Sequence, residues 1–490
     1  MAFLIFKAIR GEIMSNKKGR LSKVTWVAII LFMFISAIVG NVESIYIGLF
    51  LNNTVFKDGS MGANITLTDT INLFASLSAV VSVITTFLMG TLSDKMKNRR
   101  LFISLGFIFW GTVMLIFSSV DTLNVAGFFG IRTLPEAITM TALTVVGFAL
   151  TLTFLRSTTC DAAFNSWVTD VSTPETSTII EIAFTLMGFV STAVITVLVT
   201  SAQTEQLKYS DVFIILGLAA FVFGALGYFL IKNPQKQVEE TKKVKKLRNS
   251  RRLNNTKKVE EKTSYWQDLL YGFKPSAVKE NSKLYLILSS GCIFNCAYQV
   301  FFPYLFIYLA SVVIPANKGV NLLSKEIIST VVIALVIVIV SVLVLMKLYT
   351  KNKALSFIPS VLCLISGLFI LSSTKSIIGI IIGLTPGLIG YIIIMIQFGA
   401  TVRDNIPKDK VGLFQGIRMI FLFCIPGIIG PTLGNIAAKN SEVTYMENGA
   451  EKVLPTESMF LYAAIVAILI FIPMLAFLKK DSKKAIKEEN

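Results

Sequence analysis

Long apolar stretches separated by polar segments dominate this chain. Each is close to the ~20 residues that an α-helix needs to cross the hydrocarbon core of a membrane. Six stretches lie at residues 24–48, 69–92, 101–119, 140–168, 178–200 and 211–231, and six more at 284–311, 324–346, 354–373, 376–401, 412–436 and 457–478. Uninterrupted runs favour helices over barrel strands, which alternate polar and apolar residues. The pattern predicts an all-α membrane protein with twelve transmembrane helices.

The polar segment between the two groups of six divides the chain into halves. We predict a cytoplasmic N-terminal segment (1–23), a six-helix half (24–231), a basic cytoplasmic linker (232–283), a second six-helix half (284–478) and a cytoplasmic tail (479–490). The composition supports a membrane location, because 54% of the 490 residues are hydrophobic and only 15% are charged. We expect no cleaved signal peptide, and either Met1 or Met14 as the start.

The net charge of +17 would suggest a nucleic-acid partner in a soluble protein, but here the cations lie between the apolar runs. With both termini in the cytoplasm, 36 of the 46 Lys and Arg residues fall on the cytoplasmic side and only eight on the other. The positive-inside rule predicts this asymmetry. We therefore predict a plasma-membrane protein with no nucleic-acid partner. Its linker either binds anionic membrane lipids or is a solvated connector.

The chain contains no histidine, which excludes an imidazole proton relay and a His-ligated metal. The five cysteines fall inside apolar runs, where they act as small hydrophobic residues. The Gly-x-x-x-x-Gly-Lys-Ser/Thr nucleotide-binding loop is absent from the sequence. We therefore predict no cofactor, no metal and no enzymatic activity, and expect any proton chemistry to use carboxylates.

An internal repeat supports the two halves. The segment from Asp170 to Pro174 after the fourth apolar run has a counterpart from Asp404 to Pro407 after the tenth. Proline cannot continue the preceding helix, and acidic residues near the next helix N-terminus interact favourably with its dipole. Each segment is predicted to end one helix and start another.

Charged residues within apolar runs cost ~2.5–3.5 kcal/mol on insertion scales and are candidate functional groups. Glu43, Arg156 and Asp161 are of this kind, and Glu181 opens the fifth run. Arg156 and Asp161 are five residues apart, roughly 140° around an α-helix, which predicts different partners. We expect Arg156 to pair with Glu43 or with a substrate anion. Asp161 and Asn165 share a face that we expect to line a cavity, with helix packing as the alternative role.

Polar residues in the second half include Asn295 and Gln299, which are four residues apart and share a helix face. Since no acidic residue lies deep in these runs, we expect this half to supply hydrogen bonds to a polar solute. Glycines and a proline in the eleventh run permit close helix approach or a kink: Gly427, Gly430, Pro431 and Gly434.

A polar run from Gly90 to Arg100 separates the second and third apolar stretches. One acid and several bases in a short turn let the anion cap a helix N-terminus while the cations stay in the cytoplasm. The pattern Gly-x-Leu-Ser-Asp-basic resembles the signature loop of the major facilitator superfamily, although its usual second glycine is Lys97 here. The resemblance implies the major facilitator fold and alternating-access transport. It assigns gating to Gly90, Asp94, Arg99 and Arg100, and we add Asp170 and Asp404 from the repeat.

A weaker resemblance is to the glycoside, pentoside and hexuronide cation symporters, whose fourth helix carries an Asp followed by an aromatic and a polar pair. The segment from Asp161 to Ser166 is similar. Ser82 and Thr86 occupy the places where those symporters have an acid pair that helps to bind the coupling cation. Sodium coupling of that kind is therefore not favoured.

These features predict a secondary active transporter that moves a small polar solute, sugar-like or another metabolite, by alternating access. Coupling to a proton or cation would use Glu43 and Asp161, and Arg156 would contact substrate. Two alternatives remain open: a drug or metabolite efflux antiporter, and a non-transporting receptor or scaffold whose basic linker binds the partner. Deleting the linker distinguishes a receptor from a transporter, because a receptor would lose its signalling whereas a transporter would keep its flux.

Overall fold

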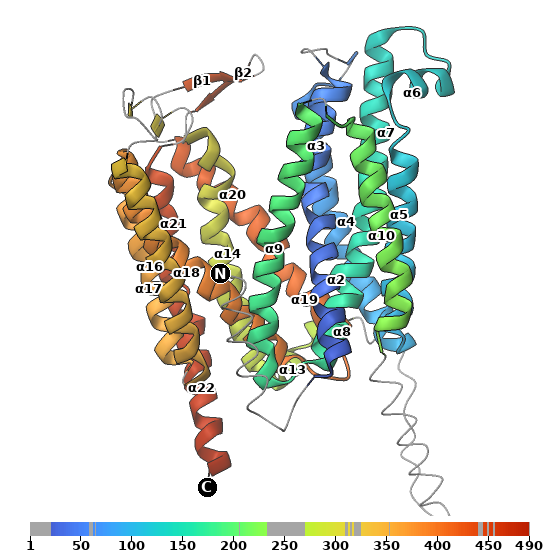
Figure 1. Ribbon diagram of the computed structural model, residues 1–490. Coiled ribbons are helices and arrows are strands. Elements are labelled where there is room, and N and C mark those ends of the chain that lie inside the picture. Colours follow the sequence, from blue (N-terminus) through green and yellow to red (C-terminus); the bar gives the residue numbers. More distant parts are fainter. Residues whose placement is uncertain are drawn as a thin grey trace, which may run out of the picture. The chain divides into compact units, whose positions relative to one another are not determined.

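The computed structural model describes residues 21–57, 62–63, 65–204, 206–232, 270–308, 312–313, 316–317, 325–351, 353–439, 444–447, 450–453 and 456–489. Within these ranges, twelve helical segments are long and apolar enough to cross a membrane. Each coincides with one of the twelve predicted stretches, so the predicted all-α membrane fold is confirmed (Figure 1). The strands of the described ranges are β1 (Thr444–Glu447) and β2 (Ala450–Val453), which pair antiparallel.

The first spanning segment combines four pieces: α2 (Lys23–Asn41), the π-helix η1 (Val42–Tyr46), α3 (Ile47–Phe50) and the π-helix η2 (Leu51–Val55). It is followed by α4 (Leu67–Met96), α5 (Arg99–Phe117), α6 (Thr122–Phe129) and α7 (Leu134–Arg156). The π-helix η4 (Ser157–Phe164) continues α7 into α8 (Asn165–Val171), and α9 (Pro174–Gln203) and α10 (Tyr209–Leu230) complete the group.

The second group begins with the short elements η5 (Tyr271–Phe273) and α13 (Pro275–Glu280). Its long helices are α14 (Ser282–Tyr308), α16 (Lys325–Lys351), α17 (Ala354–Ser372) and α18 (Ile377–Asn405). The eleventh span consists of α19 (Val411–Met419), the π-helix η7 (Ile420–Cys424) and α20 (Ile425–Lys439). The last contains α21 (Ser458–Ile468) and α22 (Phe471–Glu489).

Polar residues before the apolar runs determine where two of these helices begin. A reciprocal capping box starts α4, in which the Asp69 amide donates to Thr66 Oγ1 and the Thr66 amide donates to Asp69 Oδ2. Pro174 at the first position starts α9 four residues before the predicted apolar run. The prediction that Glu181 opens the fifth helix is therefore wrong, because Glu181 lies two turns inside α9 and is buried.

The two predicted helix breaks of the internal repeat are both present. The chain leaves α8 at Val171 and enters α9 at Pro174, and it leaves α18 at Asn405 and enters α19 at Val411. The short helix α6 was not expected, because eight residues are far below the length of a spanning run. It begins where Asp121 Oδ1 accepts a hydrogen bond from the Asn124 amide.

The chain forms two compact units. Unit 1 comprises residues 1–277 and 406–419, and unit 2 comprises residues 278–405 and 420–490. Residues 1–20 and 233–269 lie outside the described ranges, and with them Met14 and the basic run 242–248. The domain boundaries given above stay a prediction.

Glycines allow close helix contacts within each unit. In unit 1, Gly111 of α5 faces the backbone of α10 at Gly217, where a Cβ would meet the carbonyl oxygen. In unit 2, a Cβ at Gly430 or Gly434 of α20 would overlap α14 at Gln299 or Val300, which confirms the predicted close approach at these two positions. Gly427 has no such neighbour within 4 Å.

Candidate functional site

Unit 1 contains two clusters in which one arginine lies between two carboxylates. The first, the Arg99 cluster, joins Asp94 at the end of α4, Arg99 at the start of α5 and Asp170 at the end of α8. The second, the Arg156 cluster, joins Glu43 of η1, Arg156 at the end of α7 and Asp161 of η4. All six residues were candidates from the sequence, but a contact was predicted only as the option of Glu43 with Arg156.

The polar run of the signature motif is mostly helical rather than a loop. Gly90 and Asp94 lie within α4, which extends to Met96, and only Lys97 and Asn98 separate it from α5. The prediction of a helix ending at residue 92 is corrected accordingly. Lys97 adopts φ 49° and ψ 31°, the left-handed conformation that glycine tolerates best. The turn keeps the geometry that the family's usual glycine would favour, with a lysine in its place.

Arg99 is buried with all three of its guanidinium nitrogens bonded. Nη2 donates to Asp94 Oδ1 at 2.6 Å, Nε donates to Asp170 Oδ2 at 2.7 Å and Nη1 donates to Ser93 Oγ at 2.6 Å. Its side chain is 2% exposed. The side of the membrane stays a prediction, but Arg99 is not a solvated cation, because two carboxylates and a hydroxyl replace the water it loses.

Asp94 also caps a second helix, as the sequence predicted for the acid of this run. Its Oδ1 accepts from the Gly412 amide at 2.8 Å and its Oδ2 from the Leu413 amide at 3.0 Å, at the N-terminus of α19. The backbones approach so closely that a Cβ at Gly412 would overlap the Gly90 carbonyl. The carboxylate thus satisfies two of the four free amides of the helix and interacts favourably with its dipole.

Lys408, which was not a candidate from the sequence, donates hydrogen bonds to the C-terminal end of a helix, whereas Asp94 accepts them at an N-terminal end. Its Nζ donates to the Thr169 carbonyl at 2.7 Å and to the Ser172 carbonyl at 3.3 Å, at the C-terminus of α8. Gln415 of α19 donates to Thr169 Oγ1 at 3.3 Å. The signal for Lys408 was its place directly after Pro407 in the repeat, but its acceptors are backbone atoms that a sequence pattern does not reveal.

Two other residues assigned to gating lie elsewhere. The Arg100 guanidinium carbon lies 4.2 Å from the centre of the Tyr228 ring, a cation–π contact with α10. Asp404 lies near the end of α18 in unit 2, next to the buried Arg403. Arg403 was counted among the cations of the loop after the tenth run, but it lies within α18 and is buried.

The Arg156 cluster is held together by π-helical backbone. Arg156 Nε donates to Glu43 Oε2 at 2.9 Å, and Arg156 Nη1 lies 3.3 Å from Asp161 Oδ2. The prediction that Arg156 and Asp161 have different partners is therefore wrong. It assumed an α-helix, whereas the i→i+5 bonds of η4 bring residues five apart onto one side, as when the Asn165 amide donates to the Cys160 carbonyl.

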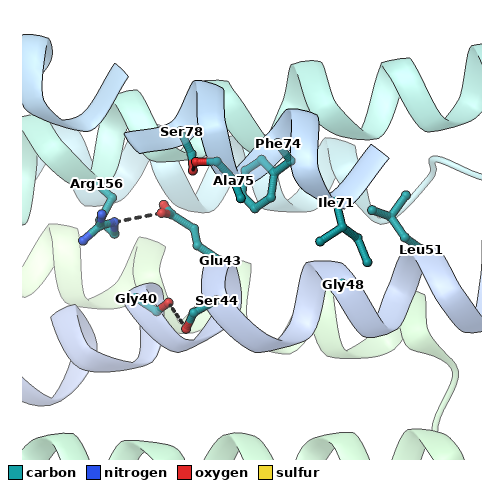
Figure 2. A pocket seen from close by; sticks show the side chains of 10 residues that line it. All are labelled: Gly40, Glu43, Ser44, Gly48, Leu51, Ile71, Phe74, Ala75, Ser78 and Arg156. Carbon is teal, nitrogen blue, oxygen red and sulfur yellow. Dashed lines mark hydrogen bonds and ion pairs between the residues drawn. The ribbon is translucent and has the colours of Figure 1, made fainter. Parts of the chain in front are cut away.

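A cavity of about 360 Å³ opens beside this cluster. It is lined by Gly40, Glu43, Ser44, Gly48, Leu51, Ile71, Phe74, Ala75, Ser78 and Arg156. Figure 2 shows Glu43 reaching toward Arg156 at one end, with Leu51 and Ile71 at the other. The volume is at the small end of the ~300–1,000 Å³ typical of ligand pockets.

The Arg156 cluster is less completely bonded than the Arg99 cluster. The Arg156 side chain is 22% exposed, and Glu43, at 9%, has one buried carboxylate oxygen, Oε1, with no hydrogen-bond partner among the described residues. Asp161 Oδ2 is near Arg156 but likewise has no hydrogen bond there. Buried carboxylate oxygens are normally bonded, so these two retain the capacity to accept further donors.

The remaining predicted contact residues are spread over both units. Asn165 begins α8, one turn beyond Asp161. Asn295 and Gln299 lie on α14 in unit 2, where the Asn295 side chain donates to the Gly291 carbonyl of its own helix and Gln299 packs against Gly430. A buried pair that the sequence did not indicate links α4 to η4, with Ser157 Oγ donating to Ser82 Oγ at 2.9 Å.

The sequence matches the family model of the Major Facilitator Superfamily over residues 24–431. Comparison with curated proteins gives no significant match.

Several solved structures are similar in fold. The proton:xylose symporter XylE aligns with a TM-score of 0.57 at 14% identity, covering 93% of this chain and 95% of that one. A bacterial homologue of the iron transporter ferroportin aligns at 0.60 and 12% identity, covering 93% and 99%. The E. coli fucose:proton symporter FucP aligns at 0.55 and 12% identity, covering 93% and 98%. With a family model that spans most of its length and a fold that agrees, the chain belongs to the Major Facilitator Superfamily and is an integral membrane transporter protein.

Proposed function

We propose that the protein is a secondary active transporter that moves a small polar solute across the plasma membrane by alternating access. The observation that carries this proposal is the cavity beside Glu43 and Arg156, in which ionisable side chains lie within spanning helices. Such groups are costly in a membrane and mark substrate or ion pathways. Family membership supports transport itself, while substrate and coupling belong to this proposal.

The Arg156 cluster is the proposed binding and coupling site. Glu43 and Asp161 take up the coupling proton or cation, because their carboxylates have free acceptor capacity. Arg156 holds both acids in place and contacts the solute from the cavity wall. Asn165 in unit 1 and Asn295 and Gln299 in unit 2 supply further hydrogen bonds at other stages of the cycle.

The Arg99 cluster is the proposed gate. Asp94 holds the N-terminus of α19 in the state described here, and release of that cap would free α19 in another state. Gly90 permits the close approach, Arg99 and Asp170 fix the carboxylate, and Arg100 and Asp404 are assigned to the same function. Both termini lie in the cytoplasm in this proposal, as the distribution of Lys and Arg predicts.

Efflux of an amphipathic compound is the second candidate. One end of the cavity is apolar and is formed by Leu51, Ile71 and Phe74. This end favours an amphipathic compound, whereas a cavity fully lined with hydrogen-bonding groups would favour a polar solute. Sugars and iron are the cargoes named for structures of similar fold, so the fold alone does not choose between solutes.

A stability screen of the purified protein tests the proposal. Sugars, nucleosides, amino acids, peptides and organic ions are added to the wild type and to Asp161→Asn and Arg156→Ala, and the unfolding temperature is measured. A compound that binds at the site stabilises the wild type and loses this effect in Arg156→Ala if it contacts the arginine, or is weakened in Asp161→Asn if it is a cation. The same compound must then move across proteoliposomes under an imposed proton or sodium gradient. Equal stabilisation of all three proteins would contradict the assignment of the binding site. If the bound compound does not enter the proteoliposomes either with or without a gradient, the transport proposal is contradicted.

A further inference from the structure

The Arg156 cluster carries one more negative than positive charge when its side chains are ionised. Among the described residues, Arg156 is the single cation between Glu43 and Asp161, and both acids lie within 3.3 Å of it. A buried charge without a counter-ion is costly in a low-dielectric environment. A second cation at the cluster would remove this imbalance, whereas an anion would increase it.

The unpaired charge has a definite position. Glu43 Oε2 is bonded to Arg156, so Oε1 is the oxygen that finds no donor in the described part of the chain. Glu43 is 9% exposed and lines the cavity. Three nearby hydroxyls donate to backbone carbonyls of their own helices instead: Ser44 to Gly40 at 2.9 Å, Ser78 to Ala75 at 3.1 Å, and Thr153, which lies next to Glu43, to Ala149 at 3.0 Å. A ligand with a positively charged N–H group would provide both the missing hydrogen bond and the missing charge.

Apart from the serines, the rest of the cavity lining is apolar. Figure 2 shows Phe74 and Ile71 of α4 and Leu51 of η2 beyond the Glu43 carboxylate. Burial of hydrocarbon against these side chains would add to affinity by ~25 cal/mol per Å² of apolar surface removed from water. The cavity therefore matches a compact molecule with a cationic head and a short apolar body.

We propose that the cavity binds a small primary or secondary amine in its ammonium form, with N–H donated to Glu43 Oε1 and the hydrocarbon body against Phe74, Ile71 and Leu51. This rests on the proposed function, of which it specifies the substrate class. A neutral alcohol would satisfy Oε1 but leave the charge uncompensated. A carboxylate ligand would compete with Glu43 and Asp161 for Arg156.

Four probes of similar size separate these chemistries in the wild-type protein. They are 2-phenylethylamine, phenyltrimethylammonium, which has the charge without an N–H group, 2-phenylethanol and phenylacetate. Apparent dissociation constants come from the concentration dependence of the unfolding temperature. The amine should bind at least ~10-fold more tightly than the alcohol, because hydrogen bonds to charged groups are the stronger ones, with the quaternary ion between them. Stronger binding of the alcohol or of phenylacetate would overturn the proposal.

Variants then locate the amine. Glu43→Gln should weaken 2-phenylethylamine at least ~10-fold and leave 2-phenylethanol nearly unchanged. Glu136→Gln, which changes an exposed acid of α7 outside the cavity, should weaken neither. Phe74→Ala should weaken 2-phenylethylamine more than it weakens ethylamine. Unchanged amine affinity in Glu43→Gln would overturn the proposal even if Phe74→Ala failed to fold.

The outcome also separates this inference from the proposed function. If no amine binds while another solute binds and crosses proteoliposomes under a gradient, the amine assignment is wrong and the transport proposal stands. If the amine binds with the expected Glu43 dependence but does not cross under any gradient, the amine assignment stands and transport of this ligand is wrong.

Discussion

The two arginine clusters of unit 1 contain the same groups and differ in how completely these are bonded. Around Arg99, three nitrogens donate to Asp94, Asp170 and Ser93, and the side chain is 2% exposed. Around Arg156, the contact with Glu43 is a hydrogen bond, the contact with Asp161 is an ion pair without one, and the side chain is 22% exposed beside a cavity. A buried ion cluster whose hydrogen-bonding groups are all paired acts as a structural latch, whereas a cluster of the same composition with unpaired groups is a candidate ligand site.

The physical reason is the balance between desolvation and attraction. Burying an ion costs several kcal/mol even after relaxation, and only good geometry with additional hydrogen bonds offsets that cost. The Arg99 cluster meets this condition with Ser93 and two amides of α19. In the Arg156 cluster, Glu43 Oε1 has no hydrogen-bond partner within the described ranges, so it can still accept a donor.

The largest expected effect is that of removing the arginine of the saturated cluster. Arg99→Ala would leave Asp94 and Asp170 buried without a cation and should lower the free energy of unfolding by ~3–5 kcal/mol. Arg156→Ala should cost less, ~1.5–3 kcal/mol, because its acids border a cavity that admits water. Denaturant unfolding of both variants in the same detergent measures the difference. A loss for Arg156→Ala as large as that for Arg99→Ala would show that the clusters are equivalent.

A methyl group at the contact between α4 and α19 should have the next largest effect. In Gly412→Ala the new Cβ would overlap the Gly90 carbonyl, so α19 must shift, at an expected cost of ~1–3 kcal/mol. Gly427→Ala is the matched control, since its Cβ would meet nothing within 4 Å. Alanine's better helix propensity should make that control neutral or stabilising. Equal unfolding temperatures for the two variants would contradict the close contact.

Removing the charge of the cap should loosen α19 selectively. Asp94→Asn weakens both the pairing with Arg99 and the bonds to the Gly412 and Leu413 amides, and loss of a cap costs ~0.5–2 kcal/mol. Hydrogen–deuterium exchange should become faster in residues 411–419. Asp121→Asn, which alters the cap of α6, serves as the control and should affect exchange only near residues 122–129. Unchanged protection of α19 in Asp94→Asn would exclude the latch.

The smallest expected effect is at the turn between α4 and α5. Lys97 has a positive φ of 49°, a conformation that costs a residue other than glycine ~1–2 kcal/mol. Lys97→Gly removes this strain but increases the conformational entropy of the unfolded chain, so the net stabilisation should be up to ~1 kcal/mol. Lys95→Gly, two residues earlier and within the last turn of α4, should instead destabilise by ~1 kcal/mol. Thermal unfolding compares the two, and a destabilising Lys97→Gly would contradict the assigned backbone conformation.

Local sequence patterns were sufficient for the spanning helices and for the capping acid. Apolar runs predicted twelve spans because a membrane helix satisfies its own backbone and needs only length and hydrophobicity. Asp94 was predicted to cap a helix because an anion interacts favourably with the positive end of a helix dipole. The identity of that helix, α19, was not predictable, since its amides lie more than three hundred residues away in sequence.

The geometry of the Arg156 cluster was beyond the sequence for a different reason. The stretch from Ser157 to Phe164 has no proline or glycine to mark an irregular helix. An i→i+5 backbone places Arg156 near Asp161, and the α-helical assumption put them on different faces. The burial of Arg99 was not predicted either, because Asp94 and Asp170 are far apart in the sequence and come together around Arg99 only when α4, α5 and α8 pack.

The most direct test of the difference between the clusters is the ligand-induced shift in unfolding temperature in two matched variants. Each of Glu43→Gln and Asp170→Asn neutralises one of the two carboxylates bonded to an arginine. With a compound that stabilises the wild type, Glu43→Gln should lose the ligand-induced shift, whereas Asp170→Asn should have a lower starting temperature and keep the shift. A shift that survives in Glu43→Gln and disappears in Asp170→Asn would contradict the assignment of ligand binding to the Arg156 cluster and of the latch to the Arg99 cluster.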